Sequence, residues 1–148
     1  MMHVEHDASL IKDLCGVIER YSTRRPMTEL ENERAIDLAA ERVWEARRAR
    51  AQVIAPHLLG EPGWDMMIDL FIAERQGRVS LVKSVCLASG VPYTTAWRWL
   101  RVLEREGLVR LTSDSKDLRR VVVRISESGY AKMFDYFQMM VRDNRCAA

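Results

Sequence analysis

The amino-acid sequence predicts a mainly α-helical protein with one small β-hairpin, an α+β fold class. Apolar residues recur with helical spacing over most of the chain, whereas between residues 109 and 125 they alternate with polar residues. The same region carries the chain's positive charge excess. With 148 residues, the chain is long enough for one domain with helical extensions and can bury a core without disulfides.

The first 55 residues are predicted to form two helices. Asp7 or Ser9 can cap the first helix. Its apolar stripe consists of Leu10, Leu14, Val17, Ile18 and Tyr21. Thr28-x-x-Glu31 is a capping-box pattern, which opens a second helix that runs to about residue 54. Apolar positions are sparse on this second helix, so we expect it to pack against a partner.

Residues 56–63 are predicted to be a connector, because they hold two prolines and two glycines. Helical spacing returns at Trp64 and continues to Gly77, which suits the position just after a helix C-terminus. A further helix is therefore expected to lead into the region of alternating pattern and positive charge.

A short helix, a turn and a longer helix are predicted next. Ser80 is expected to cap the short helix, Leu81–Ala88, and Gly90 lies in the turn. Pro92 suits the first turn of the longer helix, which ends before Gly107. This order is that of a helix-turn-helix, in which the second helix enters the major groove of DNA.

The residue types on the longer helix fit that interpretation. Cys86 and Ala96 are small and lie where the two helices should cross. The side expected to face the core carries Ala96, Trp99, Leu100 and Leu103. The candidate DNA-contacting residues are Tyr93, Thr94, Thr95, Trp97, Arg98 and Arg101, with Arg105 on the same face. Arg98 is our first choice for a base contact, because arginine can bridge O6 and N7 of guanine. Taken alone, Trp97 is better explained as a packing residue than as a DNA contact.

A two-stranded hairpin follows the longer helix. Val109 and Leu111 alternate with polar residues, and residues 121–125 repeat the pattern after the turn sequence SDSKD. The hairpin adds basic residues that could touch the DNA backbone or the minor groove: Lys116, Arg119, Arg120 and Arg124. Asp114 and Asp117 are expected to anchor the turn. A terminal helix then carries Tyr130, Met133, Phe134, Phe137, Met140 and Val141 as its apolar residues.

Charge is distributed unevenly along the chain. Residues 75–124 hold 11 Lys/Arg against 4 Asp/Glu, a net charge of +7. The remainder holds 12 against 17, a net charge of −5, so the total is only +2. A positive block of this size within an otherwise acidic chain predicts a surface that binds a polyanion such as double-stranded DNA.

Residues 64–129 resemble the winged-helix domain of MarR-type transcriptional regulators. The match is carried by LEREGLVR (Leu103–Arg110) and by the run Asp114–Gly129, which resembles D-P-x-D-R-R-x-x-x-V-x-L-T-x-x-G. The residues in register are Asp114, Asp117, Arg119, Val123, Ile125, Ser126 and Gly129. Ser115 replaces the usual proline and Leu118 the first arginine, so the wing-tip contact passes to Lys116 or Arg120 or is weaker.

The resemblance implies a homodimer whose terminal helices intertwine. The dimerisation residues would then be Leu10, Leu14, Ile18, Tyr21, Met133, Phe134 and Phe137. The expected domains are a dimerisation arm over residues 1–55, a winged helix-turn-helix over 56–128 and a dimerisation helix over 129–148. Ser80 joins the wing residues as an expected contact to the DNA backbone. The resemblance also implies a small aromatic effector, or in some relatives a cysteine switch.

Other classes of function lack their motifs. The chain has no phosphate-binding glycine loop, nucleophile elbow or zinc-protease motif, so we expect neither enzyme activity nor a cofactor. Its scattered histidines are His3, His6 and His57, and its cysteines are Cys15, Cys86 and Cys146. They form no CxxC or zinc pattern, and reduced thiols in a cytoplasmic protein are expected. No apolar run is long enough for a signal peptide or a membrane span.

The sequence therefore predicts a homodimeric, sequence-specific DNA-binding transcriptional regulator, and the resemblance implies control by a small molecule. The alternative is a winged helix that binds another protein and not specific DNA. In that case the terminal helices would be the docking surface, and Tyr93 and Trp97 would serve as anchors. Binding to random and genomic duplexes separates the two hypotheses.

Overall fold

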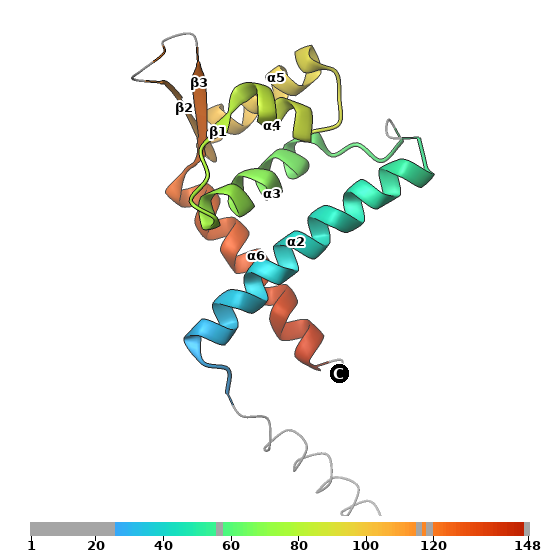
Figure 1. The fold of residues 1–148 in the computed structure, drawn as a ribbon, viewed down its shortest axis with the longest axis vertical. Coiled ribbons are helices and arrows are strands. Elements are labelled where there is room, and N and C mark those ends of the chain that lie inside the picture. Colours follow the sequence, from blue (N-terminus) through green and yellow to red (C-terminus); the bar gives the residue numbers. More distant parts are fainter. Residues whose placement is uncertain (1–25, 56–57, 115–116, 118–119, 147–148) are drawn as a thin grey trace, which may run out of the picture. The chain divides into compact units, whose positions relative to one another are not determined.

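The computed structural model describes residues 26–55, 58–114, 117 and 120–146. Its elements in order are α2 (Glu29–Val53), α3 (Pro62–Arg75), β1 (Ser80–Leu81), α4 (Val82–Ala88), α5 (Tyr93–Arg105), β2 (Val109–Ser113), β3 (Val121–Ile125) and α6 (Glu127–Cys146) (Figure 1). Mainly helical structure with a small antiparallel sheet is the predicted α+β class. The first predicted apolar stripe, which includes Leu10, Leu14, Ile18 and Tyr21, lies outside the described residues.

Helix α2 begins with the predicted capping box. The Thr28 amide donates to Oε2 of Glu31 at 2.8 Å, and the Glu31 amide donates to Oγ1 of Thr28 at 3.2 Å. These reciprocal bonds satisfy two amides that have no partner within the helix. Only Ile36 and Ala40 of α2 are buried, so apolar contact holds this helix over a short stretch.

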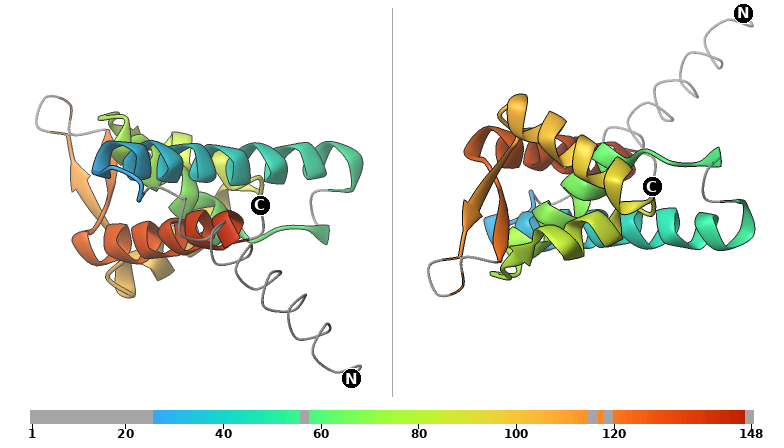
Figure 2. Two further views of the ribbon diagram at one scale, coloured as in Figure 1. Left: turned by 90° about the horizontal axis from the view of Figure 1, so that it is seen from below. Right: turned by 90° about the horizontal axis from the view of Figure 1, so that it is seen from above.

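The sheet has one more strand than the sequence predicted. Its order is β1-β3-β2, and both pairings are antiparallel. In β1, Ser80 pairs with Val123 of β3. The residue that precedes α4 is Leu81, and no side chain caps this helix. The prediction that Ser80 caps α4 is therefore wrong, because pairing with β3 holds it in extended backbone. Figure 2 shows β2 and β3 at one edge, beside the helices.

Helix α3 supplies the centre of the core. Met66, Ile68, Leu70 and Phe71 are almost completely buried, and the helix contacts α4, α5, α6 and β3. The Phe71 ring lies 5.3 Å from that of Phe137 on α6. Fully burying an apolar side chain of this size contributes about 1.5–3 kcal/mol, so α3 fixes the positions of the other elements.

The burial of α6 corrects the expected dimerisation residues. Met133 is 3% exposed and Phe137 is fully buried, both within this chain. Neither side chain can therefore be offered to a second copy in this conformation, because α3 already covers α6. Phe134 is half-buried, and the guanidinium of Arg75 lies 5.9 Å from its ring centre.

The start of α6 is fixed by Ser126 and Gly129, two residues of the recognised pattern. The Ser126 hydroxyl donates to the Gly107 carbonyl at 2.6 Å and accepts from the Gly129 amide at 3.0 Å. The Ser126 amide donates to the Leu108 carbonyl at 2.9 Å. A Cβ on Gly129 would lie far inside van der Waals contact with that carbonyl and 3.0 Å from Cγ1 of Ile125. This position therefore requires glycine.

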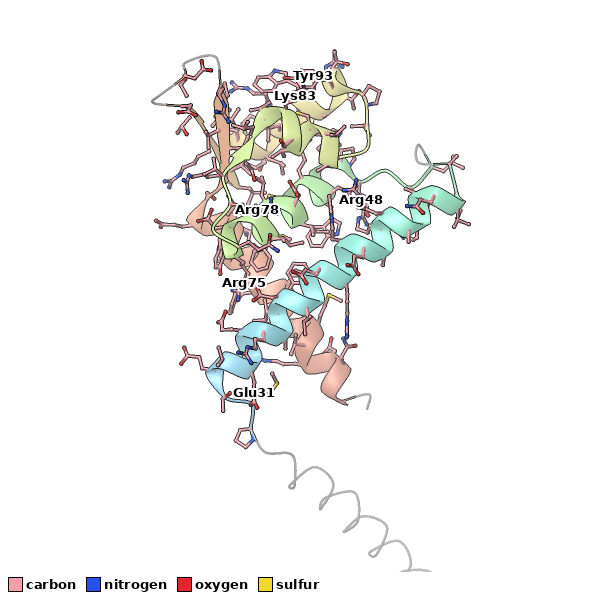
Figure 3. All side chains as sticks on the ribbon, in the orientation of Figure 1. Glu31, Arg48, Arg75, Arg78, Lys83 and Tyr93 are labelled. Carbon is pink, nitrogen blue, oxygen red and sulfur yellow. The ribbon has the colours of Figure 1, made fainter. Side chains whose placement is uncertain are left out.

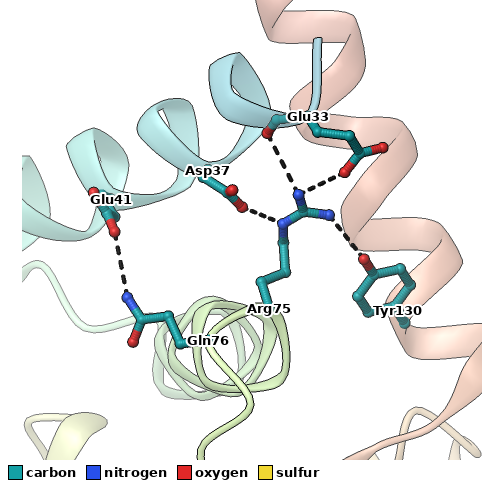
Figure 4. Close-up of polar contacts among 6 residues, drawn as sticks. All are labelled: Glu33, Asp37, Glu41, Arg75, Gln76 and Tyr130. Atoms are coloured by element: carbon teal, nitrogen blue, oxygen red, sulfur yellow. Dashed lines mark hydrogen bonds and ion pairs between the residues drawn. The ribbon is translucent and has the colours of Figure 1, made fainter. Parts of the chain in front are cut away.

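Arg75 joins three helices through a branched set of hydrogen bonds (Figure 4). Its Nη2 donates to Oε2 of Glu33 at 2.6 Å, its Nε donates to Asp37, and its Nη1 donates to the Tyr130 hydroxyl at 2.9 Å. Burial by itself lowers the pKa of Arg75, but the bonds to Asp37, Glu33 and Tyr130 outweigh it and raise the pKa. The side chain is 12% exposed and stays charged.

Replacing Gly129 with alanine should destabilise the fold. Overpacking typically costs about 1–3 kcal/mol, and here the obstacle is backbone, which cannot rotate away. The midpoint of urea unfolding, measured for Gly129→Ala and for the exposed neighbour Ser128→Ala, tests this. A Gly129→Ala protein as stable as Ser128→Ala would contradict the close approach.

The hydrogen bond between Arg75 and Tyr130 can be measured by a double-mutant cycle. We expect Tyr130→Phe to cost about 1.5–3 kcal/mol, because a hydrogen bond from a charged donor to the hydroxyl is lost. In an Arg75→Met background the same change should cost close to nothing, because the donor is absent. Equal losses of unfolding free energy in both backgrounds would show that the bond does not contribute.

Candidate nucleic-acid interface

The α4–α5 pair has the geometry of a helix-turn-helix. Gly90 adopts φ +70°, a left-handed conformation that favours glycine, and its amide donates to the Leu87 carbonyl at 3.3 Å. Cys86 is 1% exposed and Ala96 is fully buried, as expected for small residues between crossing helices. Burial also raises the pKa of the Cys86 thiol, so this cysteine remains a neutral, inert core residue.

Helix α5 is strongly amphipathic. Its buried residues are Ala96, Leu100 and Leu103, which confirms three of the four residues expected to face the core. The fourth, Trp99, is 42% exposed. Its ring lies over Gly63 at the start of α3: a Cβ built on Gly63 would be 3.3 Å from Cε3 of Trp99. The missing side chain at Gly63 lets the indole lie on the surface of α3 instead of entering the core.

The predicted contact residues of α5 share its exposed side. Tyr93 is 56% exposed at the start of the helix, and Figure 3 shows it at the same end of the molecule as Lys83. The exposed members of the predicted set are Tyr93, Thr94, Thr95, Arg98 and Arg101, whereas Trp97 is half-buried. A basic and hydroxyl-bearing face therefore stands free on the outer side of the helix-turn-helix.

The two central arginines of this face differ in their surroundings. Arg101 forms an ion pair with Glu104, one turn further along α5. Such an exposed pair contributes about 0–1 kcal/mol, so it holds Arg101 only weakly. Arg98 forms no ion pair with any residue that the structure describes. Its guanidinium is the more available donor for a base edge.

The hairpin places two arginines opposite each other. Arg110 on β2 pairs in register with Arg124 on β3, and both are exposed. Arg124 also lies 4.0 Å from Glu74, a weak, solvent-exposed pair. Like charges directly opposite each other on a sheet are destabilising. The sequence analysis included these charges in the net charge but did not predict that the two arginines lie opposite each other. The alternation of Val109 and Leu111 with polar residues is the sequence signal that places Arg110 on the exposed side of its strand.

The remaining residues predicted to contact the DNA backbone differ in their exposure. Arg120 is exposed. Its amide donates to the Asp117 carbonyl at 2.9 Å, and its carbonyl accepts from the Asp114 amide at 2.8 Å. Lys116 and Arg119 lie outside the described residues. Ser80 is only 6% exposed within the sheet, so we remove it from the expected DNA-backbone contacts. Lys83, exposed on α4, is a basic neighbour that sequence reasoning overlooked.

The described residues form neither a cluster of metal-binding side chains nor a helix that could span a membrane. No group of three or more His, Cys, Asp or Glu side chains among them is arranged to hold a metal ion. None of the described helices is both long enough and apolar enough to cross a bilayer. The exposed basic face of α5 and the paired arginines of the hairpin are the features that indicate binding of an anionic partner.

Replacing Arg110 with threonine should stabilise the isolated protein. The change removes a like-charge pair and introduces a residue that favours strands, so we expect a gain of about 0.2–1 kcal/mol in unfolding free energy. Thermal or urea unfolding at low salt measures the gain. The gain should shrink at high salt, where the repulsion is screened. A loss of stability would show that Arg110 is held by favourable contacts.

Comparison with known proteins gave structural similarities alone. No family model matches the chain, and no curated protein matches it. Among solved structures, the S. aureus MepR–DNA complex is 22% identical with a TM-score of 0.48. That match covers 57% of this chain and 65% of the MepR chain, less than two thirds of its length. The heme sensor PefR from Streptococcus agalactiae, in complex with heme, is 14% identical, with coverages of 100% and 82% and a TM-score of 0.46.

A third matched structure is a probable transcriptional regulator from Pseudomonas aeruginosa. It is 17% identical with a TM-score of 0.45, and the match covers 73% of this chain and 77% of that one. The winged-helix arrangement of the present chain is evident in its own elements, because α4, a glycine turn, α5 and the β2–β3 hairpin follow in that order.

Proposed function

We propose that this protein is a DNA-binding transcriptional regulator in which α5 reads the major groove and the hairpin contacts the backbone or the minor groove. The exposed basic face of α5 carries the proposal. Helix α5 has 13 residues, and an α-helix with its side chains is about 10–12 Å in diameter, which fits a major groove about 12 Å wide. Its apolar side is committed to the core, so Arg98 and its neighbours point outward.

The surroundings of α5 support an anionic partner. The charge excess of residues 75–124 coincides with α4, α5 and the hairpin. The pairing of Arg110 with Arg124 costs stability in the free protein and would be relieved by phosphate. A surface that tolerates such repulsion is better suited to DNA than to an apolar protein partner.

A homodimer would align two α5 helices with the half-sites of a pseudo-palindromic operator. Described residues offer a surface for it: a groove of about 320 Å³ between α2 and α6, lined by Leu38, Val43 and Met140 among others. Leu38 is 53% exposed and Met139, also on α6, is 54% exposed. We propose this groove as part of the dimer surface, in place of the buried Met133 and Phe137.

The second candidate function, a protein-binding module, is favoured by one observation. Tyr93 and Trp99 expose 56% and 42% of their surface on α5, and exposed aromatic residues are frequent anchors of protein interfaces. Titration with random and genomic duplexes at low salt separates the functions. Failure to bind any duplex would reject the DNA-binding proposal and leave the module.

Replacing Arg98 with alanine should weaken binding to a selected operator by about 1–3 kcal/mol and relax the preference at one base position. Affinity for the operator and for single-base variants, measured by fluorescence anisotropy, gives both values. Arg142→Ala, which removes an exposed arginine from α6, is the matched control and should bind like the wild type. An equal loss on every duplex would assign Arg98 to phosphate contact.

A further inference from the structure

The exposed face of α5 carries three arginines in different electrostatic surroundings: Arg98, Arg101 and Arg105. Arg101 alone among them forms an ion pair with a residue that the structure describes. Its Nη1 donates to Oε2 of Glu104, three residues further along the helix. Residues at this spacing are neighbours on the surface of a helix. Arg101 therefore differs from the other two, because a carboxylate of the protein already holds part of its guanidinium.

Glu104 is the more restricted partner of this pair. Its side chain is 30% exposed, whereas that of Arg101 is 58% exposed. Glu104 is also the penultimate residue of α5, where the partial negative charge of the helix C-terminus makes a carboxylate unfavourable. The carboxylate thus does not stabilise α5 through the helix dipole. Its clearest effect in the structure is to fix the direction of the Arg101 guanidinium.

The bond to Glu104 leaves the other edge of the Arg101 guanidinium free. Glu104 accepts from Nη1, and no described residue accepts from Nε or Nη2. A guanidinium carries five N–H donors, and the edge formed by Nε and Nη2 can hold two acceptors at once. That edge fits two kinds of acceptor on DNA, the oxygens of a phosphate and the O6 and N7 of a guanine.

The carboxylate of Glu104 distinguishes between these two acceptors by their charge. A phosphate on Arg101 would bring a second anion close to Glu104, and the two negative charges would repel each other. The edge of a guanine is uncharged, so Arg101 can bind it and keep its bond to Glu104. A DNA groove that excludes water also strengthens a bond that contributes little on the free surface. Contact with a base is therefore favoured over contact with a phosphate.

We propose that Glu104 is a positioning residue that directs Arg101 to a base edge and so raises the sequence specificity of α5. The inference rests on the proposed DNA-binding function. Arg101 lies three residues after Arg98, which is about 4.5 Å along the helix axis, and successive base pairs are about 3.4 Å apart. The two arginines can therefore read different base pairs, which makes their effects separable.

The test measures the affinity of the full chain for an operator selected from random sequence, for its single-base variants and for an unrelated duplex. Arg101→Ala identifies the base position that Arg101 reads, as the position where the preference falls. Glu104→Gln keeps the size of the side chain and removes its charge. We expect it to lower the preference at that same position about threefold and to tighten binding of the unrelated duplex about threefold. The preference at the position read by Arg98 should not change.

Salt dependence and a matched variant separate positioning from a general effect of charge. Glu104→Gln frees Arg101 to bind a phosphate, so the slope of log affinity against log salt should steepen by about 0.9, as for one added phosphate contact. Glu106→Gln is the control, because Glu106 is exposed directly after α5 and forms no ion pair with any described residue. Its loss of negative charge should tighten binding of every duplex alike and leave the base preferences unchanged.

Several outcomes would overturn the positioning role of Glu104. Unchanged base preference in Glu104→Gln, or the same loss in Glu106→Gln, would do so. A loss of preference on adding Glu104→Gln to Arg101→Ala would show that Glu104 acts without Arg101. Arg101→Ala with every base preference intact would show that Arg101 reads no base. These outcomes leave the proposed function standing, whereas a wild type that binds no duplex at low salt would reject both.

Discussion

The close approach of the first turn of α6 to the start of β2 is the constraint on which the winged helix depends. Ser126 uses both its hydroxyl and its amide to bind the carbonyls of Gly107 and Leu108. The absence of a side chain at Gly129 lets the α6 backbone reach the same corner. These contacts join the end of α5, the hairpin and α6 at one point. The hairpin therefore stands in a fixed relation to α5, as the two proposed DNA contacts would require.

Apolar contacts and charged contacts hold different parts of the structure. Helix α3 holds α4, α5, α6 and the sheet through a buried apolar core. Helix α2 buries only Ile36 and Ala40. Its polar attachments include ion pairs centred on Arg75 and Arg47 and a hydrogen bond from Gln76 to Glu41. Ion pairs at partly exposed positions are weaker and more sensitive to salt than apolar burial. Movement between α2 and the rest would thus cost less than movement within the winged helix.

The proposed functions use charges that the fold leaves unsatisfied. The α5 face with Arg98 and the hairpin pair of Arg110 and Arg124 point away from the core and lack strong partners among the described residues. Charge placed where it does not stabilise the fold is available for a ligand.

The sequence by itself determined what depends on local spacing: the capping box of α2, the glycine turn, the outward face of α5 and the alternation of the hairpin. Only the tertiary structure decided which apolar surfaces meet. It brought Ser80 into a third strand, turned Phe137 toward α3 and left Trp99 on the surface over Gly63. The spacing of apolar residues along the sequence shows on which side of a helix they lie. It does not show which distant segment will cover that side, because that depends on contacts between residues far apart in the chain.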